Sequence, residues 1–335
     1  MINLNTVSPE LMAYVTEDDQ RVVENVYGQK VDELTKRIER GTTEYKLAGR
    51  AFRLFEERPF EWDESQALIC LGEFGNGLNH AAVARAIAIR DAVMPNANLL
   101  MFPNDCYEDR AFVNLSKDER RRLRHGDPGP MVERVQTTLE KPPELQAYET
   151  VAVFGPSQGG TIGAAVAADP NSPVVALHTN EAPNVKDRSR LKLVRNFAGS
   201  GAHLKDAIRI NGDPELLPIV GHHIDQLTIP GMARFVRGIV LPQNIALAAI
   251  LRRNSLEDDF EKALYRGGSV VHYWTDKDEV SPADENWEIA HRLSAQPRYD
   301  GRQLDGLEAD HSSTNVAYIG IAGTRKAYDL LRQTA

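Results

Sequence analysis

Ser157 stands in a sequence context that suits nucleophilic catalysis. The five residues Gly155-Pro156-Ser157-Gln158-Gly159 fit the pattern G-x-S-x-G. A serine hydroxyl is a poor nucleophile unless a base takes its proton, and an acid must hold that base in the right tautomer. The sequence should therefore supply an acid and a histidine after Ser157.

Asp278 and His311 are the acid and the base that we predict. Asp278 follows the apolar run 267–274, and His311 lies in a later loop, before the final helix. Both loops follow predicted strands, in the chain order Ser, Asp, His that this kind of serine turn requires. We predict that Ser157 attacks the substrate, that His311 accepts its proton and that Asp278 orients His311.

Two other carboxyl groups are alternatives to Asp278. Asp276 lies in the same loop, where it also suits the capping of a turn. Glu181 lies in the loop 180–184, which follows another apolar run and is expected at the same sheet edge as Ser157. The residue types alone leave both alternatives open.

The other histidines and the glycines favour neither a metal nor a nucleotide. His178 ends an apolar run and suits the core, whereas the adjacent His222 and His223 would point apart on a helix or a strand. No carboxylate pattern completes a metal site around them. The glycines near Ser157 lack G-x-G-x-x-G and the P-loop pattern G-K-[ST]. We therefore predict no metal and no organic cofactor.

The elements around Ser157 should place its hydroxyl at the edge of a sheet. The run 151–154 predicts a buried strand, and the Gly- and Ala-rich stretch after the serine predicts a tightly packed helix. Strand, sharp turn and helix form a nucleophile elbow, whose small flanking residues let the turn close. The N–H of Gln158, at the start of the helix, would then face the oxyanion that forms during attack.

Further apolar runs predict a parallel sheet. The helix predicted over 80–94 separates strands 66–71 and 98–102, which is the spacing of a right-handed βαβ unit. Other strands are predicted at 173–179, at 267–274, within 298–307 and once within 44–60, and other helices over 131–139, over 283–293 and from 315 onward.

The loop that carries Asp278 resembles a loop of the α/β-hydrolase superfamily. The stretch 274–282, WTDKDEVSP, is similar to that superfamily's acid loop, W-G-x-x-D followed by V-x-P, with Thr275 in place of the usual Gly. The resemblance covers roughly 45–183 and 267–335. It implies an α/β fold with a mostly parallel, doubly wound sheet flanked by helices.

A second loop extends this resemblance to the oxyanion hole. Leu71-Gly72-Glu73-Phe74 stands where the superfamily carries an H-G-x-x loop, with Leu71 in place of the common His. The resemblance implies that Glu73 or Phe74 supplies the second oxyanion N–H beside that of Gln158, and we favour Phe74.

Changes in composition along the chain suggest four segments. Residues 1–43 predict an N-terminal helical extension, and 44–184 and 267–335 the two parts of the hydrolase-like core. Residues 185–266 are charged, helix-patterned and broken by Gly and Pro, which predicts an inserted helical cap. Its apolar pieces, 229–240 and 245–251, could roof a substrate pocket or cover a small core of their own.

Bulk composition limits the classes of partner. The chain has 335 residues, 42% of them hydrophobic, and a net charge of −9, which argues against nucleic acid. We find neither a membrane-length apolar run nor a signal peptide. Cys70 and Cys106 lack metal-ligand spacing and suit a reducing compartment. We therefore expect a cytoplasmic protein.

These residues together predict a serine hydrolase that cleaves an ester through an acyl-enzyme. The apolar stretches of the cap favour a small-molecule ester with an acyl or aromatic part. The alternatives are an acyltransferase or a perhydrolase on the same fold, or a hydrolase-fold module that binds without catalysis. The N-terminal extension or the cap could also form a homo-oligomer.

Overall fold

The computed structural model describes most of the chain. The described residues are 11, 13–73, 78–103, 114–140, 148–183, 204–226, 242–252, 255–305 and 310–333. Phe74, Cys106 and the apolar stretch 229–240 lie outside them.

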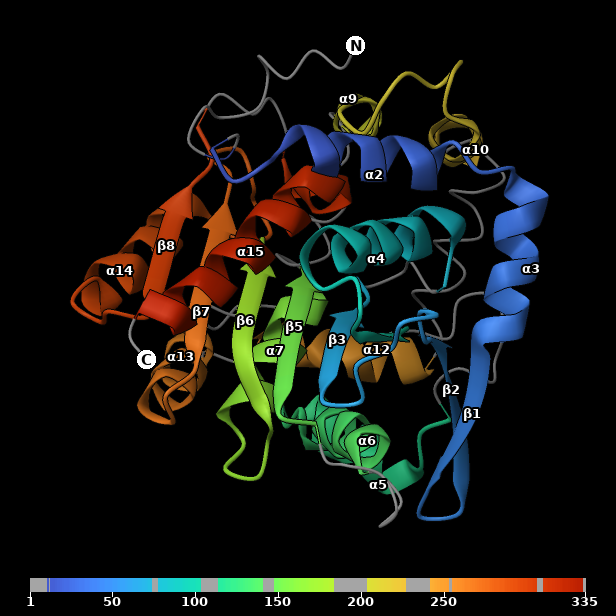
Figure 1. The fold of residues 1–335 in the computed structure, drawn as a ribbon. Coiled ribbons are helices and arrows are strands. Elements are labelled where there is room, and N and C mark those ends of the chain that lie inside the picture. Colours follow the sequence, from blue (N-terminus) through green and yellow to red (C-terminus); the bar gives the residue numbers. More distant parts are fainter. Residues whose placement is uncertain are drawn as a thin grey trace.

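A sheet of eight strands forms the centre of the molecule (Figure 1). The strand order is β1-β2-β4-β3-β5-β6-β7-β8, and all pairs from β4 to β8 are parallel. The strands are β1 (Thr42–Leu47), β2 (Arg50–Glu57), β3 (Gln66–Leu71), β4 (Asn98–Phe102), β5 (Thr150–Pro156), β6 (Val174–Asn180), β7 (Ser269–Trp274) and β8 (Tyr299–Gln303). The prediction of a mostly parallel sheet is confirmed.

The first two strands are an antiparallel hairpin, where the sequence predicted only one strand. Ala48 and Gly49 connect them, with φ angles of +48° and +76°. Two successive positive φ angles match the right-handed twist of a hairpin. Because β2 also runs antiparallel to β4, the hairpin extends one edge of the parallel sheet.

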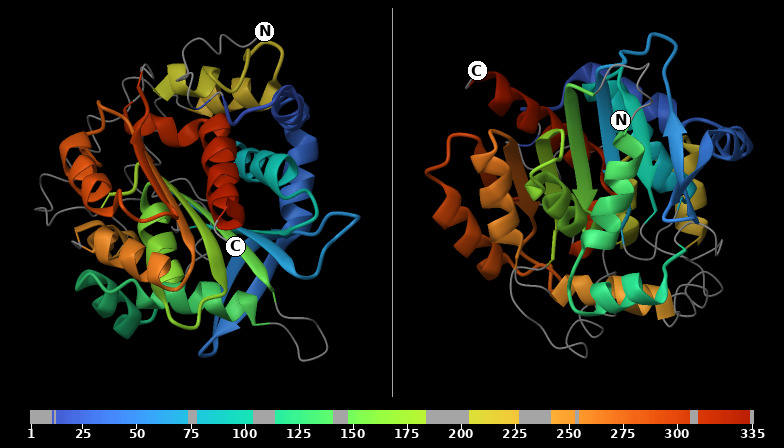
Figure 2. Two further views of the ribbon diagram at one scale, coloured as in Figure 1. Left: turned by 60° about the vertical axis from the view of Figure 1, so that its left-hand side comes forward. Right: turned by 90° about the horizontal axis from the view of Figure 1, so that it is seen from below.

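Helices cover both faces of the sheet (Figures 1 and 2). The core on one face includes α2 (Glu17–Tyr27), α3 (Val31–Gly41), α4 (His80–Val93) and α15 (Ala317–Gln333). The core on the other face includes α5 (Lys117–Arg124), α6 (Gly129–Leu139), α7 (Gln158–Ala168), α13 (Leu256–Tyr265) and α14 (Ala283–Leu293). The central strands are buried from both sides and therefore read as continuous apolar runs in the sequence.

The described parts of 185–266 are helical. They form α9 (Leu204–Arg209), α10 (Pro218–Gln226), α12 (Pro242–Ala249), the short 3-10 helix η2 (Ile250–Arg252) and α13. Helix α10 packs on α2, α3 and α4, and α9 packs on α10, whereas α12 packs on α5 and α13 packs on α7 and β7. Thus α13 lies in the layer that covers the sheet, although the sequence division grouped it with the cap. The four-segment division itself stays a prediction.

The apolar part of α12 and η2 packs into the core. Ala246, Leu247, Ile250 and Leu251 are all buried in the cluster that contains α7, and Ile245 is partly exposed. The sequence left open a pocket roof or a small separate core for 245–251, whereas these four side chains join the large core on one face of the sheet. Among the described residues, no helix is both long enough and apolar enough to cross a membrane.

Candidate active site

Ser157 occupies the sharp turn between β5 and α7, and its backbone is strained. Its φ of +51° and ψ of −126° lie where non-glycine residues rarely occur. A Cβ on Gly155 would lie 2.4 Å from the Gly159 carbonyl oxygen, and one on Gly159 would lie 2.4 Å from the Leu71 carbonyl oxygen. The pattern G-x-S-x-G is therefore a steric requirement of this turn.

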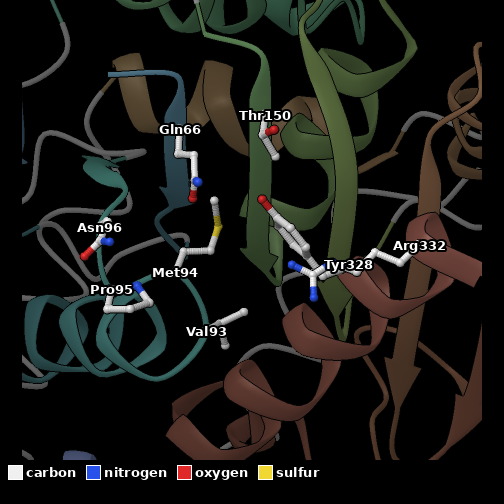
Figure 3. A pocket seen from close by; sticks show the side chains of 8 residues that line it. All are labelled: Gln66, Val93, Met94, Pro95, Asn96, Thr150, Tyr328 and Arg332. Carbon is white, nitrogen blue, oxygen red and sulfur yellow. The ribbon is translucent and has the colours of Figure 1, made fainter. Parts of the chain in front are cut away.

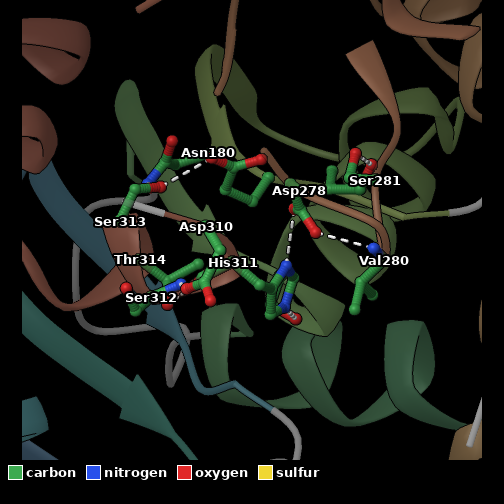
Figure 4. A network of polar contacts seen from close by, with 12 residues as sticks. Asn180, Asp278, Val280, Ser281, Asp310, His311, Ser312, Ser313 and Thr314 are labelled. Carbon is green, nitrogen blue, oxygen red and sulfur yellow. Dashed lines mark hydrogen bonds and ion pairs between the residues drawn. The ribbon is translucent and has the colours of Figure 1, made fainter. Parts of the chain in front are cut away.

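Three predicted residues form a continuous hydrogen-bonded series. His311 Nε2 lies 2.6 Å from Ser157 Oγ, and His311 Nδ1 lies 2.7 Å from Asp278 Oδ2. With the ring proton on Nδ1, His311 donates to Asp278 and accepts from the serine hydroxyl. His311 lies in the 3-10 helix η3 (His311–Asn315), before α15, and Asp278 lies in the loop after β7. Figure 4 shows His311 and Asp278 pointing toward one another.

Asp278, rather than either alternative, contacts the histidine. The Asp278 side chain is buried, and its Oδ1 accepts a hydrogen bond of 2.7 Å from the Val280 N–H (Figure 4). Asp276, two residues earlier, is exposed. Glu181 is buried beside Asp278, but its Oε1 accepts from Ser313 Oγ at 2.7 Å.

The pKa values of the pair shift in opposite directions. Burial opposes the charge on Asp278, but attraction to His311 and hydrogen bonds from its neighbours outweigh burial and lower its pKa. Burial also opposes the charge on His311, but Asp278 raises the pKa of His311 above its usual value, with smaller contributions from Glu73 and Asp310. The site thus favours an ionised Asp278 and a strengthened base.

One of the two predicted oxyanion donors lies in the described part. Gln158 is the first residue of α7, where helix N–H groups lack partners within the helix. Its side chain is fully buried and donates to the Leu247 carbonyl oxygen at 2.9 Å, which ties α12 to the turn. The second predicted donor, Phe74, lies outside the described residues, so its role stays a prediction.

Sequence reasoning missed a buried ion pair beside the histidine. Glu73 Oε1 lies 2.6 Å from Arg85 Nη1, and both side chains are more than 90% buried. Thr314 Oγ1 donates to Glu73 Oε2 at 3.2 Å, and Arg85 donates to the Thr314 carbonyl oxygen. The pair joins the loop after β3 to α4 and η3. The H-G-x-x position could have drawn attention to Glu73, but nothing in the sequence indicated its partners.

His178 and His222 contact residues outside this series. His178 is fully buried between the rings of Phe154 and Tyr273, and burial lowers its pKa to about 3. His222 lies 2.9 Å from Gln226 and packs edge-on against His80. Within the described residues, the single group with metal-ligand spacing is Glu181, Asp278 and His311, whose atoms already bind one another and Ser157.

A hollow of about 430 Å³ lies away from this constellation (Figure 3). Gln66 and Thr150, the first residues of β3 and β5, line it together with Tyr328 and Arg332. Ser157 follows the last residue of β5, so the hollow lies at the opposite end of the strands.

Comparisons with known proteins match this architecture. The fold is similar to that of a protein described as a lipase (lip1) from Acinetobacter baumannii AYE, with a TM-score of 0.54 and 11% identity over 91% of this chain and 97% of the other. An alpha/beta hydrolase from Novosphingobium aromaticivorans DSM 12444 has a TM-score of 0.52 and 13% identity, over 87% and 98% of the chains. A bromoperoxidase from Bacillus anthracis has a TM-score of 0.51 and 11% identity, over 87% and 99%.

The chain has the α/β-hydrolase fold. This confirms the fold expected from the resemblance of its loops. No protein-family model and no curated protein matches the sequence. In this fold, Ser157 lies at the carboxyl ends of the central parallel strands, where α/β sheets bind their ligands.

Proposed function

We propose that this protein is a serine hydrolase that cleaves carboxylic esters through Ser157, His311 and Asp278. The observation that carries the proposal is the unbroken series from Ser157 Oγ to His311 and on to Asp278, with contacts of 2.6 and 2.7 Å. All three side chains are buried, and the serine is held at a positive φ. A serine whose only role was to form a turn would need neither partner.

The reaction would proceed in two acyl-transfer steps. As Ser157 Oγ attacks the ester carbonyl carbon, His311 takes the serine proton, and Asp278 stabilises the imidazolium that forms. The N–H of Gln158, with Phe74 as the second donor, holds the oxyanion, a role worth about 100-fold or more in rate. His311 then protonates the leaving alcohol and activates the water that releases the acyl group.

The substrate we propose is a small-molecule ester with an acyl or aromatic part. The similar structures include proteins described as a lipase and as an alpha/beta hydrolase, which agrees with this class. No cofactor is required, because the three side chains supply the nucleophile, the base and its orienting acid.

Steady-state hydrolysis of p-nitrophenyl esters of graded chain length tests this proposal. The wild type should turn over at least one ester, and Ser157→Ala should remove that turnover. Ser294→Ala, which alters an exposed serine whose hydroxyl donates to the His291 carbonyl oxygen at the end of α14, should keep that turnover. Equal rates for the wild type and Ser157→Ala would contradict the proposal. Wild-type transfer of the acyl group to added alcohol or peroxide in preference to water would replace the hydrolase with an acyltransferase or a perhydrolase.

A further inference from the structure

Glu181 is held in a strained position directly beside the proposed catalytic acid. It follows β6 with a φ of +54°, and its side chain is completely buried. Its N–H donates to the Tyr273 carbonyl oxygen of β7 at 2.8 Å. A non-glycine residue at positive φ is strained, so its surroundings must hold it there.

The two oxygens of Glu181 have different neighbours. Oε1 accepts the hydrogen bond from Ser313 Oγ, two residues after His311, and Asn180 Nδ2 donates to that hydroxyl at 3.4 Å (Figure 4). Oε2 is buried with no donor from the described residues. Ligand atoms of Glu181, Asp278 and His311 all lie within 4.8 Å of one another, so the two carboxyl groups are neighbours in the same buried site.

Two carboxylates that share a buried site cannot both be ionised without a large energetic cost. Asp278 is the one that His311 and the Val280 N–H stabilise as an anion. The proton therefore belongs on Glu181, where it turns an oxygen without a donor into a hydrogen-bond donor toward Asp278. Burial raises the pKa of Glu181 well above its usual value, Asp278 raises it further, and the hydroxyls of Ser313 and Thr275 offset part of the shift.

We propose that Glu181 is a positioning residue, whose protonated carboxyl group donates a hydrogen bond to Asp278 and so fixes that carboxylate against His311. This role rests on the proposed function of the site. Glu181 then adds to the support that Asp278 receives from His311 and the Val280 N–H.

The proposed proton makes catalysis sensitive to alkaline pH. Among the described residues, the charged group that acts on Glu181 is Asp278, which in turn faces His311; Glu73 and Asp310 act on His311. When Glu181 loses its proton at high pH, the hydrogen bond is lost and two adjacent anions repel each other. The rate should fall as the pH rises through the raised pKa of Glu181.

Two substitutions of Glu181 separate this role from simple packing. In Glu181→Gln, the amide keeps an acceptor for Ser313 and a donor for Asp278 without a titratable proton. Glu181→Leu is similar in size but has no donor. On a p-nitrophenyl ester that the wild type cleaves, we expect kcat of Glu181→Leu to fall about tenfold or more with KM nearly unchanged. Glu181→Gln should keep kcat within about threefold of the wild type and should lose the alkaline decline.

Asp19→Asn is the matched control. Asp19 is another buried carboxyl group, but it pairs with Arg325 on α15 at 2.6 Å. This variant should lower stability and keep the alkaline decline. An alkaline decline that persists in Glu181→Gln would overturn the proposal, as would a kcat for Glu181→Gln as low as that of Glu181→Leu.

Infrared spectroscopy provides a readout that needs no turnover. The C=O stretch of a protonated carboxyl group should be present in the wild type and in Asp19→Asn at neutral pH, and absent from Glu181→Gln. If the band is present and no ester is cleaved, the proposed function fails while the protonated Glu181 stands. If esters are cleaved and Glu181→Gln loses no band, the positioning role fails and the hydrolase stands. If Glu181→Leu does not fold, Glu181→Gln alone still tests the proposal through the alkaline decline in rate and the infrared band.

Discussion

The two ends of the central strands differ in what lies beside them: strained, buried polar residues at the carboxyl ends and an open hollow at the amino ends. The carboxyl ends of β5, β6 and β7 lead to Ser157, Glu181 and Asp278, all buried, two of them at positive φ. The amino ends of β3 and β5 border a hollow of about 430 Å³ that Gln66, Thr150 and Arg332 line. We propose the active site at the carboxyl ends and not at the hollow, because strain and desolvated polar contacts persist only where the fold stabilises them against their own cost.

The largest effect should come from Asp278 at the carboxyl ends. Asp278→Asn keeps the shape of the side chain but favours the wrong tautomer of His311, so kcat should fall about 10⁴-fold. Asp276→Asn, in the same loop but exposed, should change kcat less than about threefold. Ester hydrolysis by the purified variants checks both. A large loss in Asp276→Asn alone would make Asp276 the catalytic acid.

The pH dependence should have an acid limb set by His311. The base must be neutral to accept the serine proton, and Asp278 holds the pKa of His311 above its ordinary value of about 6.5. The kcat/KM should therefore rise with pH through a midpoint above that value. Asp310→Asn removes a charge that raises this pKa and should move the midpoint to lower pH. A midpoint that stayed in place would show that the Asp310 charge does not reach the histidine.

The smallest effect on kcat/KM should come from a substitution at the amino ends of the strands. Arg332 lines the hollow there and belongs to α15, far along the strands from Ser157. Arg332→Ala should change kcat/KM by no more than about twofold, because a surface substitution remote from the site has little energetic effect. A loss of tenfold or more would mean that the hollow takes part in substrate binding.

Much of the fold, and the meeting of three residues in the candidate site, could be predicted because the signals are local. The strand, G-x-S-x-G turn and helix around Ser157 occupy one short stretch, and Asp278 and His311 each follow a recognisable apolar run. The second strand of the β1–β2 hairpin was missed because its turn, Ala48-Gly49, lacks the usual Asn-Gly or Asp-Gly pair.

The rest depends on contacts between distant segments. Glu73, Arg85 and Thr314 meet only when the loop after β3, helix α4 and η3 come together. Glu181 reaches Asp278 because β6 and β7 pair in a parallel register that ends with Asn180 beside Tyr273. No pattern in the sequence predicts that register. The sequence could therefore suggest Glu181 as an alternative acid, but not as a partner of Asp278.

Labelling with a fluorophosphonate tests the central claim most directly. The probe reacts with a serine only when a base activates that serine and an oxyanion site accepts the phosphoryl oxygen. Intact-mass measurement should show one adduct on the wild type, mapped to Ser157, and none on Ser157→Ala or His311→Ala under the same conditions. A folded wild-type protein that takes up no label, or that takes it up equally in Ser157→Ala, would contradict a nucleophilic Ser157.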